Sequence, residues 1–236
     1  MTDRKLFSLV IPTYDERENI LTLLGAAHSA LGDRPHEIIV VDDDSPDLTW
    51  KIVEDFGKTH PWARAIRRRG ERGLSSAVIA GFDGARGDIL GVMDADLSHD
   101  ETILPALLDR IEQGADMAIG SRRIEGGGAT RWPWYRRLTS SVATRLAQHL
   151  LQLEISDPMS GYFILTREVY QTAKKTLKPT GYKILLELYC RARPRVVAEV
   201  PFVFRDRRQG HSKLSASVMR QFLSMVMALR RDAGRN

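Results

Sequence analysis

Residues Ile89–Asp100 read ILGVMDADLSHD, in which the apolar stretch Ile89–Met93 runs directly into carboxylates at Asp94 and Asp96. A short apolar run of this kind is typical of a strand buried in a sheet. Two carboxylates so close together repel each other unless a cation or hydrogen-bond donors lie between them. Hard divalent ions such as Mg²⁺ and Mn²⁺ prefer oxygen ligands. We therefore predict a buried strand that aims Asp94 and Asp96 at such an ion, with a helix cap or a solvated loop as the alternative.

The first half of the chain alternates between apolar strands and amphipathic helices. Strands are predicted at Leu6–Ile11, Glu37–Val41, Ala65–Arg68, Ile89–Met93 and Asp116–Ile119, and helices at Glu16–Leu31, Leu48–His60, Leu74–Ala85 and Ile103–Gln113. This order predicts an α/β fold with a mostly parallel central sheet and helices on both of its faces. Ligands of such sheets bind beyond the carboxyl ends of the strands. Acidic residues stand at two of these ends, in Asp42–Asp44 and at Asp94 and Asp96.

The second half of the chain is less regular. We expect a loop over the glycines at 126–128 and the stretch RWPWYRR at 131–137, and a turn at Asp157–Gly161. Arg195–Phe204 is predicted to be extended, and Leu138–Leu151 and Leu214–Leu229 each carry an apolar stripe at helical spacing. The expected organisation is one main domain over residues 1–212, followed by a C-terminal amphipathic helix and tail over residues 213–236.

Composition narrows the class of function. The chain has 236 residues, a formal net charge of +5 and a single cysteine, Cys190, so an intrachain disulfide and a cysteine metal cluster are excluded. Basic clusters alternate with acidic islands, which favours a site for a specific anion over a general grip on nucleic acid. The charged opening MTDRKLF does not resemble a signal peptide. No apolar run approaches the roughly 18 residues of a spanning helix, so a cytoplasmic location is expected.

Candidate nucleotide-binding residues follow the first two strands. Pro12, Tyr14 and Glu16 come after the first strand and Asp43 after the second. An aromatic ring can stack on a nucleobase, and a carboxylate can accept hydrogen bonds from a base or from ribose hydroxyls. The alternative for both segments is structural, because turns and helix caps use the same residue types.

Candidate phosphate-binding residues are basic and lie in the second half of the chain. They are Arg122, Arg136, Arg207 and Lys213. The planar fork of arginine matches phosphate oxygens and lysine adds a point charge. A solvated surface is the alternative, although the glycine and serine in DRRQGHSK at 206–213 would let that segment bend around an anion. His99 and His211 are expected to face solvent.

Several strings taken together resemble the inverting glycosyltransferases of family two. They are VIPTYDERENI, VVDDDSPDLTW, RGLSSAVIAGF, VMDADLSHD, GSR, DPMSGYF, GYKILLE and VPFVFRDRRQGHSKL, in this order over nearly the whole chain. Within the family they are most similar to the enzymes that mannosylate dolichol phosphate or other polyprenol phosphates. The resemblance implies a GT-A fold, a nucleotide-sugar donor such as GDP-mannose, a divalent metal and a polyprenyl phosphate acceptor.

The resemblance also implies roles for individual residues. The nucleoside would be held by Pro12, Tyr14, Glu16, Val41 and Asp43. The metal and the diphosphate would be held by Asp94 and Asp96, with Ser98 at a position where related enzymes often carry glutamine. The donor and acceptor phosphates would be met by Arg122, Arg136, Arg207 and Lys213, so that the expected catalytic set is Asp94, Asp96, Arg122, Arg207 and Lys213.

A lipid-linked acceptor implies contact with a membrane surface. Some relatives carry transmembrane helices after the catalytic part, and this sequence shows none. The apolar faces of Leu138–Leu151 and Leu214–Leu229 are therefore expected either to lie in the membrane interface, peripheral at the cytoplasmic face, or to pack on the sheet. No obligate protein partner is inferred.

Other functions remain open at this point. Within the enzyme class, the chain could transfer glucose from UDP-glucose to a polyprenyl phosphate, or transfer a hexose to a sugar acceptor. In another class, it could be a non-catalytic module that binds anionic lipid or nucleic acid, although two acidic strand ends would repel a polyanion. A dinucleotide oxidoreductase is disfavoured, because no G-x-G-x-x-G follows the first strand.

Overall fold

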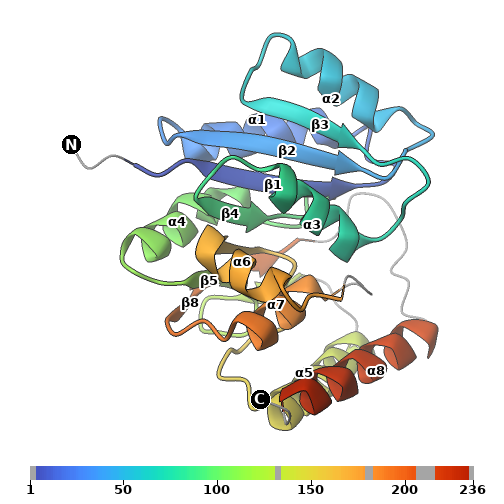
Figure 1. Ribbon diagram of the computed structural model, residues 1–236, viewed down its shortest axis with the longest axis vertical. Helices are drawn as coiled ribbons and strands as arrows, with labels where there is room; N and C mark the ends of the chain where they lie inside the picture. Colours follow the sequence, from blue (N-terminus) through green and yellow to red (C-terminus); the bar gives the residue numbers. More distant parts are fainter. Residues whose placement is uncertain (1–3, 131–133, 179–182, 206–215, 234–236) are drawn as a thin grey trace.

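The computed structural model describes residues 4–130, 134–178, 183–205 and 216–233 (Figure 1). Its centre is a seven-stranded sheet of order β3-β2-β1-β4-β7-β5-β8. Neighbouring strands are parallel, except that β7 runs antiparallel to β4 and to β5. The strands are β1 (Phe7–Thr13), β2 (His36–Asp42), β3 (Ala63–Arg67), β4 (Ile89–Val92), β5 (Met117–Ser121), β7 (Phe163–Thr166) and β8 (Val197–Pro201). The predicted α/β fold with a mostly parallel sheet is confirmed.

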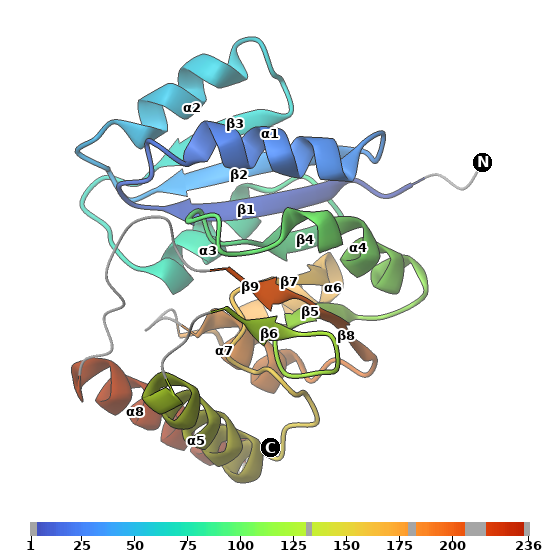
Figure 2. The same cartoon turned by 180° about the vertical axis from the view of Figure 1, so that it is seen from behind.

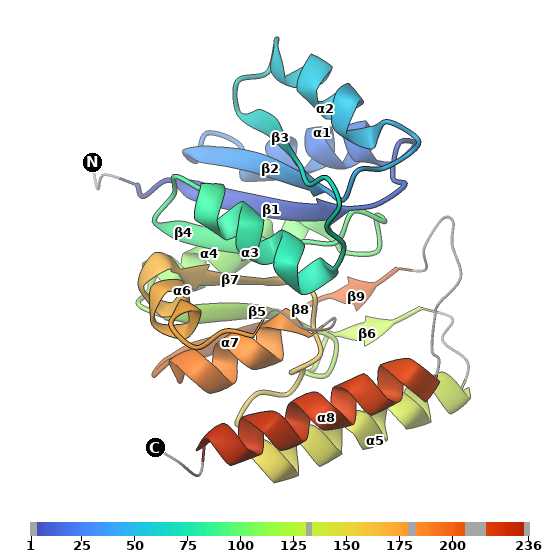
Figure 3. The ribbon, with the colours of Figure 1, turned by 45° about the vertical axis from the view of Figure 1, so that its right-hand side comes forward.

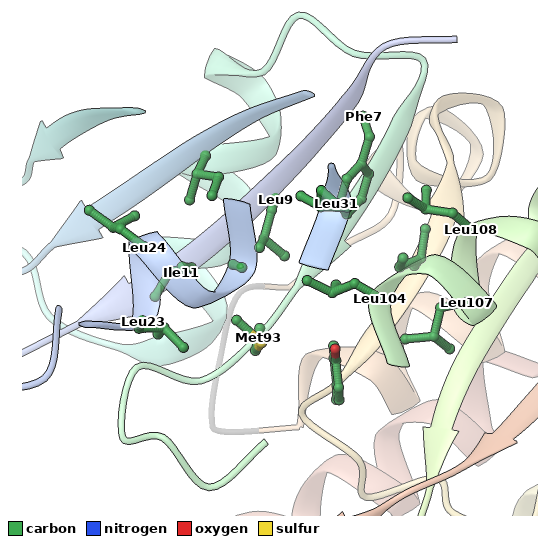
Figure 4. Packing of buried hydrophobic residues seen from close by; sticks show 14 of the residues in the cluster. Phe7, Leu9, Ile11, Leu23, Leu24, Leu31, Met93, Leu104, Leu107 and Leu108 are labelled. Atoms are coloured by element: carbon green, nitrogen blue, oxygen red, sulfur yellow. The ribbon is translucent and has the colours of Figure 1, made fainter. Parts of the chain in front are cut away.

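Helices cover both faces of the sheet, as predicted. One face carries α1 (Ile20–Leu31), α2 (Thr49–Gly57) and α4 (Leu104–Glu112), and the other carries α3 (Leu74–Gly84), α6 (Arg167–Lys174) and α7 (Ile184–Ala192). Successive strand residues point to opposite faces, so Leu9 and Ile11 join the first core and Val10 joins the second. Figure 4 shows the first core, in which Leu9 and Ile11 pack against α1 and the leucines of α4 lie beyond Leu9.

The order of the strands brings the two acidic segments to one edge. β1 lies between β2 and β4, with Thr13 opposite Asp42 and Val10 opposite Val92. The three strands are parallel, so their carboxyl ends open onto the same rim. The loops that carry Tyr14, Asp43 and Asp94 therefore leave the sheet side by side.

Three elements between Phe163 and Ala192 were not predicted from the sequence. β7 is only four residues long and passes directly into α6, without the glycine or proline that usually separates elements. Thr166 ends the strand and caps the helix, because its hydroxyl accepts a hydrogen bond from the amide of Val169. When a short strand and a short helix are fused in this way, neither the strand spacing nor the helical spacing of apolar residues continues long enough to be recognised in the sequence.

The predicted loop over 126–137 is wrong in part. Gly128–Ala129 forms β6, which pairs with β9 (Val203–Phe204) in a separate two-stranded sheet (Figure 2). The predicted strand Arg195–Phe204 is thus divided between β8 and β9. Helix α5 (Trp134–Leu151) begins four residues before the predicted start at Leu138. The proline of RWPWYRR stands just before that start, and proline favours the beginning of a helix as much as a loop.

Helices α5 and α8 (Ala216–Ala233) lie side by side and form a third layer at one end of the molecule (Figure 3). They share a small core with α7, made of Ala147, Leu186, Phe222, Val226 and Leu229. The described part of the apolar stripe predicted on the C-terminal helix, Phe222, Val226 and Leu229, is therefore buried against α5 and α7 rather than against the sheet. In the described part of the chain, no helix is both long and apolar enough to cross a bilayer.

A buried carboxylate holds the opposite end of the sheet together. Glu37 accepts hydrogen bonds from the Ser8 hydroxyl (2.7 Å) and the Arg86 amide (2.6 Å), and it forms ion pairs with Arg64 and with the Arg86 side chain. Burial alone would raise the pKa of Glu37, but these donors and charges outweigh it and lower the pKa below its ordinary value.

Replacing Glu37 with glutamine should lower the free energy of unfolding at pH 7 by about 2 kcal/mol, because charge-assisted hydrogen bonds are lost inside the protein. A carboxyl whose pKa is lowered in the folded state stabilises the fold above its unfolded pKa, 4.5 for glutamate, and ceases to do so as the pH falls through the folded value. Urea denaturation at pH 7 and at lower pH would show the difference between the two proteins shrinking on acidification. Asp55→Asn, at an exposed ion pair, is the control and should leave the midpoint unchanged.

Candidate active site

The loops after β1 and β2 are joined to each other by hydrogen bonds. Asp42 is fully buried and accepts from the hydroxyls of Thr13 (3.1 Å) and Ser45 (2.7 Å). The amide of Asp43 donates to the carbonyl of Thr13, and the amide of Asp15 donates to the Ser45 hydroxyl (3.0 Å). Asp42 is thus a structural residue. It fixes the two loops so that their neighbouring residues are presented together.

Asp43 is held by a buried arginine that was not identified from the sequence. Nε of Arg68 donates to Oδ1 of Asp43 (2.8 Å), Nη2 donates to the same oxygen, and the amide of Gly73 donates to Oδ2 (2.8 Å). Arg68 is only 6% exposed and also bonds Glu71 and Ser76. An arginine in the cluster 67–69 reads as a surface residue in the sequence, and only the fold reveals its acidic partner.

The other expected nucleoside residues line the same rim. Tyr14 is exposed, and the guanidinium of Arg72 lies 4.4 Å from the centre of its ring while donating to its hydroxyl. Glu16 accepts from Asn19 (2.8 Å). Pro12 lies opposite Val41 in the β1–β2 register. The Val41 side chain is buried in the sheet core, so only its backbone is available to a ligand.

Asp94 follows β4, and His99 lies beside it. The expectation that His99 faces solvent is wrong, because its ring is 2% exposed and stacks on Tyr162. The amide of Asp94 donates to Nδ1 of His99 (3.1 Å). The aromatic residues that bury the histidine come from later parts of the chain, so its position could not be read from the local sequence.

Asp96 is nearly buried and is oriented by Ser98. The amide and the hydroxyl of Ser98 both donate to Oδ1 of Asp96, and Leu97 between them adopts a left-handed backbone conformation with φ of 59°. The fully buried Ser98 hydroxyl is therefore better placed to orient Asp96 than to bind a metal directly.

A divalent metal fits this rim through its oxygen donors. Asp94 and Asp96 offer carboxylates, the ligands that Mg²⁺ and Mn²⁺ prefer. Among the described residues, no group of three histidine, cysteine or acidic side chains is arranged to hold an ion by itself. Such a pair suits an ion that takes its remaining ligands from water and from substrate phosphates.

Arg122 leaves the end of β5 and is bound by Asp157. Nε and Nη2 of Arg122 donate to the two oxygens of this fully buried carboxylate (2.7 and 2.8 Å), and the Arg122 amide donates to it as well. Burial alone would raise the pKa of Asp157, but the hydrogen bonds and charge of Arg122 lower it. Glu199 accepts from the amides of Ser156 and Asp157 (2.9 and 3.2 Å), which fixes the turn that carries this carboxylate.

The turn at 157–161 joins the basic part of the site to the acidic part. Gly161 lies so close to Asp94 that a Cβ on this residue would stand 3.1 Å from a carboxylate oxygen. Lys183 lies just before α7, and its Nζ donates to the carbonyl oxygen of Met159 at 3.5 Å. Burial, followed by the charge of Arg122, lowers the pKa of Lys183, while Asp94 and Asp157 act in the opposite direction. The turn DPMSG is therefore part of the site, which its turn-like composition did not indicate.

Three of the expected phosphate-binding residues are not placed. Arg207 and Lys213 lie outside the described residues, and Arg136 lies in α5 but its side chain is outside them. The segment before Arg207 is anchored beside the acidic loop, because the amide of Arg205 donates to the carbonyl of Ser98 (2.9 Å) and its side chain pairs with Asp100 (3.1 Å).

The rim therefore combines two kinds of charge. Carboxylates stand at the ends of β2 and β4, and the basic side chains of Arg122 and Lys183 lie around the neighbouring turn at 157–161. A ligand with a cation-bound diphosphate would satisfy both groups.

Known proteins resemble this chain over most of its length. The family model described as glycosyl transferase family 2 matches residues 8–173. A dolichol-phosphate mannosyltransferase of Pyrococcus furiosus is 43% identical over 96% of this chain, which covers 64% of that protein. A polyprenol monophosphomannose synthase of Mycolicibacterium smegmatis is 38% identical over 92% of this chain and 84% of its own length. A dolichol-phosphate mannosyltransferase of Saccharomyces cerevisiae is 38% identical over 94% of this chain and 86% of its own length.

Solved structures support the fold. Glucosyl-3-phosphoglycerate synthase from Mycobacterium tuberculosis, in complex with Mn²⁺, UDP-glucose and phosphoglyceric acid, superposes with a TM-score of 0.72. It covers 96% of this chain and 80% of its own, at 20% identity. At that identity the likeness concerns the fold alone, and it confirms the predicted GT-A architecture. The family match and the identities above show that this chain belongs to glycosyl transferase family 2.

Proposed function

We propose that this glycosyltransferase transfers mannose from GDP-mannose to a polyprenyl phosphate, with inversion at the anomeric carbon. The observation that carries the proposal is the match over nearly the whole chain to proteins named dolichol-phosphate mannosyltransferase or polyprenol monophosphomannose synthase, at 36–43% identity. The chain spans 64% of the Pyrococcus furiosus relative, so the proposal concerns the catalytic part that the two share.

In this proposal the nucleoside lies over the ends of β1 and β2. Tyr14 offers a ring face, and Asp43 accepts from the base or the ribose while Arg68 keeps its carboxylate in place. Pro12, Glu16 and the backbone of Val41 complete the set. Because the loops are already fixed, less conformational entropy is lost when the nucleoside binds.

The diphosphate lies between the acidic and the basic parts of the rim. A Mg²⁺ or Mn²⁺ ion held by Asp94 and Asp96 would neutralise charge on the leaving diphosphate. Arg122, fixed by Asp157, would place the positive charge of its guanidinium beside phosphate oxygens. Arg136, Arg207 and Lys213 are proposed to bind the donor and acceptor phosphates, as the resemblance implies.

The acceptor needs no general base. A phosphate monoester has its second pKa near 6, so its oxygen is largely deprotonated at neutral pH. The protein then has two tasks, which are to hold two anions in line and to stabilise the charge that leaves. Attack on the side opposite the diphosphate inverts the anomeric carbon.

We further propose that α5 and α8 rest on the membrane that contains the acceptor, with the protein peripheral at the cytoplasmic face. Val142 and Leu146 on α5, and Leu223 and Met227 on α8, are exposed apolar side chains on helices that also expose arginines 145, 220, 230 and 231. Apolar residues beside basic ones are the pattern of interfacial helices. Residues 213–236 would then extend the catalytic domain of 1–212 toward the lipid.

The donor can be identified by thermal unfolding with GDP-mannose, UDP-glucose, GDP and UDP, each with Mg²⁺ or Mn²⁺. We expect GDP-mannose with metal to raise the melting temperature most, because a ligand at about 100 times its Kd adds ~2.7 kcal/mol to the folded state. Stabilisation by UDP-glucose and not by GDP-mannose would instead favour the glucosyltransferase. Stabilisation by none of the nucleotides would contradict a nucleotide-sugar enzyme.

Asp96→Asn should lower mannosyl transfer to a polyprenyl phosphate by at least ~10²-fold, since a preorganised charge near the leaving group is lost. Radiolabelled GDP-mannose and extraction of the lipid product measure the rate. Asp109→Asn on α4, which removes an exposed carboxylate paired with Arg34, is the matched control and should keep full activity. A folded Asp96→Asn protein with unchanged turnover at saturating metal would rule out the proposed site.

Membrane contact can be tested by co-sedimentation with vesicles of phosphatidylglycerol and phosphatidylcholine. The double variant Val142→Ser/Leu146→Ser should bind several-fold more weakly than the wild type, because it removes exposed apolar area that would enter the interface. Leu21→Ser, at an exposed leucine on α1, controls for loss of apolar surface elsewhere. Equal sedimentation of all three proteins would contradict the assignment of α5.

A further inference from the structure

His99 is placed by aromatic residues from two later parts of the chain. Its ring stacks on Tyr162, with centroids 4.9 Å apart and an angle of 14° between the planes. The rings of Phe202 and Phe204 stand nearly perpendicular to it, with centroids 5.5 and 5.7 Å away. Tyr162 is itself fixed, because its hydroxyl donates to the carbonyl of Asp100 (3.1 Å). The imidazole therefore has one position, set by residues outside the loop to which it belongs.

The histidine contacts Asp94 at two points. Nδ1 accepts from the amide of Asp94 at 3.1 Å, so this nitrogen carries no proton and the ring proton is on Nε2. Nε2 lies 3.7 Å from Oδ2 of the same residue. The backbone amide of Asp94 is thus bonded to the ring, and its carboxylate lies close to the same ring.

This contact closes the loop that carries the proposed metal ligands. The bond joins Asp94 to a residue five positions later, and Asp96 lies between them. Within the loop, Leu97 has a positive φ, which costs free energy for a residue with a side chain. Gly161 lies close against the Asp94 carboxylate and leaves no room for a side chain there. A loop with internal strain keeps its shape only where its ends are held.

A purely packed ring would not need a nitrogen at this place. Phenylalanine would fill the aromatic cluster equally well, but it would leave the amide of Asp94 without its acceptor in a region from which water is largely excluded. The nitrogen, rather than the ring, therefore points to a function connected with Asp94.

We infer that His99 is a positioning residue that holds Asp94 in the geometry needed to bind a divalent cation together with the nucleotide diphosphate. The inference rests on the metal role proposed for Asp94 and Asp96. Groups that orient metal ligands in this way typically change metal affinity by ~10–100-fold when they are replaced.

The test compares the Mn²⁺ affinity of three variants. Electron paramagnetic resonance measures Mn²⁺ binding in the presence of saturating GDP. His99→Phe keeps the stack and removes the acceptor. His99→Asn and His99→Gln both lose the stack, but asparagine places an amide oxygen near the position of Nδ1 and glutamine reaches the position of Nε2. We expect Mn²⁺ to bind ~10–100-fold more weakly to the Phe and Gln variants and close to normally to the Asn variant.

Two further measurements separate this role from general damage. GDP binding without divalent metal, by calorimetry, should be the same in all variants that fold, because the nucleoside residues lie on other loops. Transfer activity of His99→Phe should recover as the metal concentration is raised. The control is His28→Phe. His28 is another stacked histidine, which packs on Trp62, and its replacement should leave Mn²⁺ affinity unchanged.

The outcomes are distinct. Wild-type Mn²⁺ affinity in His99→Phe would overturn the inference, and so would equal weakening in the Asn and Gln variants, which would assign the effect to stacking. Failure of the wild type itself to bind Mn²⁺ with GDP would remove the proposed metal site. The comparison of Asn with Gln remains decisive if the Phe variant does not fold.

Discussion

The site depends on keeping several carboxylates close together at the end of one sheet. Parallel pairing of β2, β1 and β4 places the acidic loops next to each other, and unscreened like charges at such range repel. Three of these carboxylates are oriented by donors from the protein. Asp42 has the hydroxyls of Thr13 and Ser45, Asp43 has Arg68, and Asp96 has Ser98. Some of the charge is neutralised in the fold and the rest is left for a ligand, which explains why the rim is both acidic and rigid.

The antiparallel strand β7 connects the two halves of this arrangement. It lies between β4 and β5, so its entry turn reaches the rim where those strands end. That turn supplies Gly161 against Asp94 and Asp157 against Arg122, and Glu199 on β8 holds its backbone. A parallel strand in the same place would have brought its other end to the rim. The one reversal of direction in the sheet is thus what joins the cation side of the site to the anion side.

Most of the sheet, and the acidic part of the site, could be predicted from the sequence. Apolar runs that end in Asp42 and Asp94 indicate both the strands and their functional ends, because the spacing of apolar residues and the place where a run ends can be read from the local sequence. The fused β7 and α6, the partner of Asp43 and the buried ring of His99 could not be predicted. Each of these depends on contacts between residues far apart in the chain, as for Arg68 with Asp43 and Phe202 with His99. Asp157 in DPMSG and Arg68 in RRR have ordinary surface roles in the sequence, and only the fold pairs them with Arg122 and Asp43, respectively.

The paired helices α5 and α8 have a consequence for how the protein is made. Ala147 on α5 is covered in the finished molecule by residues of α7 and α8, which include Leu186 and Val226. During translation the last residue of α5, Leu151, is added 65 residues before Ala216, the first residue of α8. At ~5–20 residues per second this interval lasts several seconds. A nascent chain therefore displays the inner face of α5 while its partner does not yet exist, and during that time a chaperone or a bilayer has first access to it.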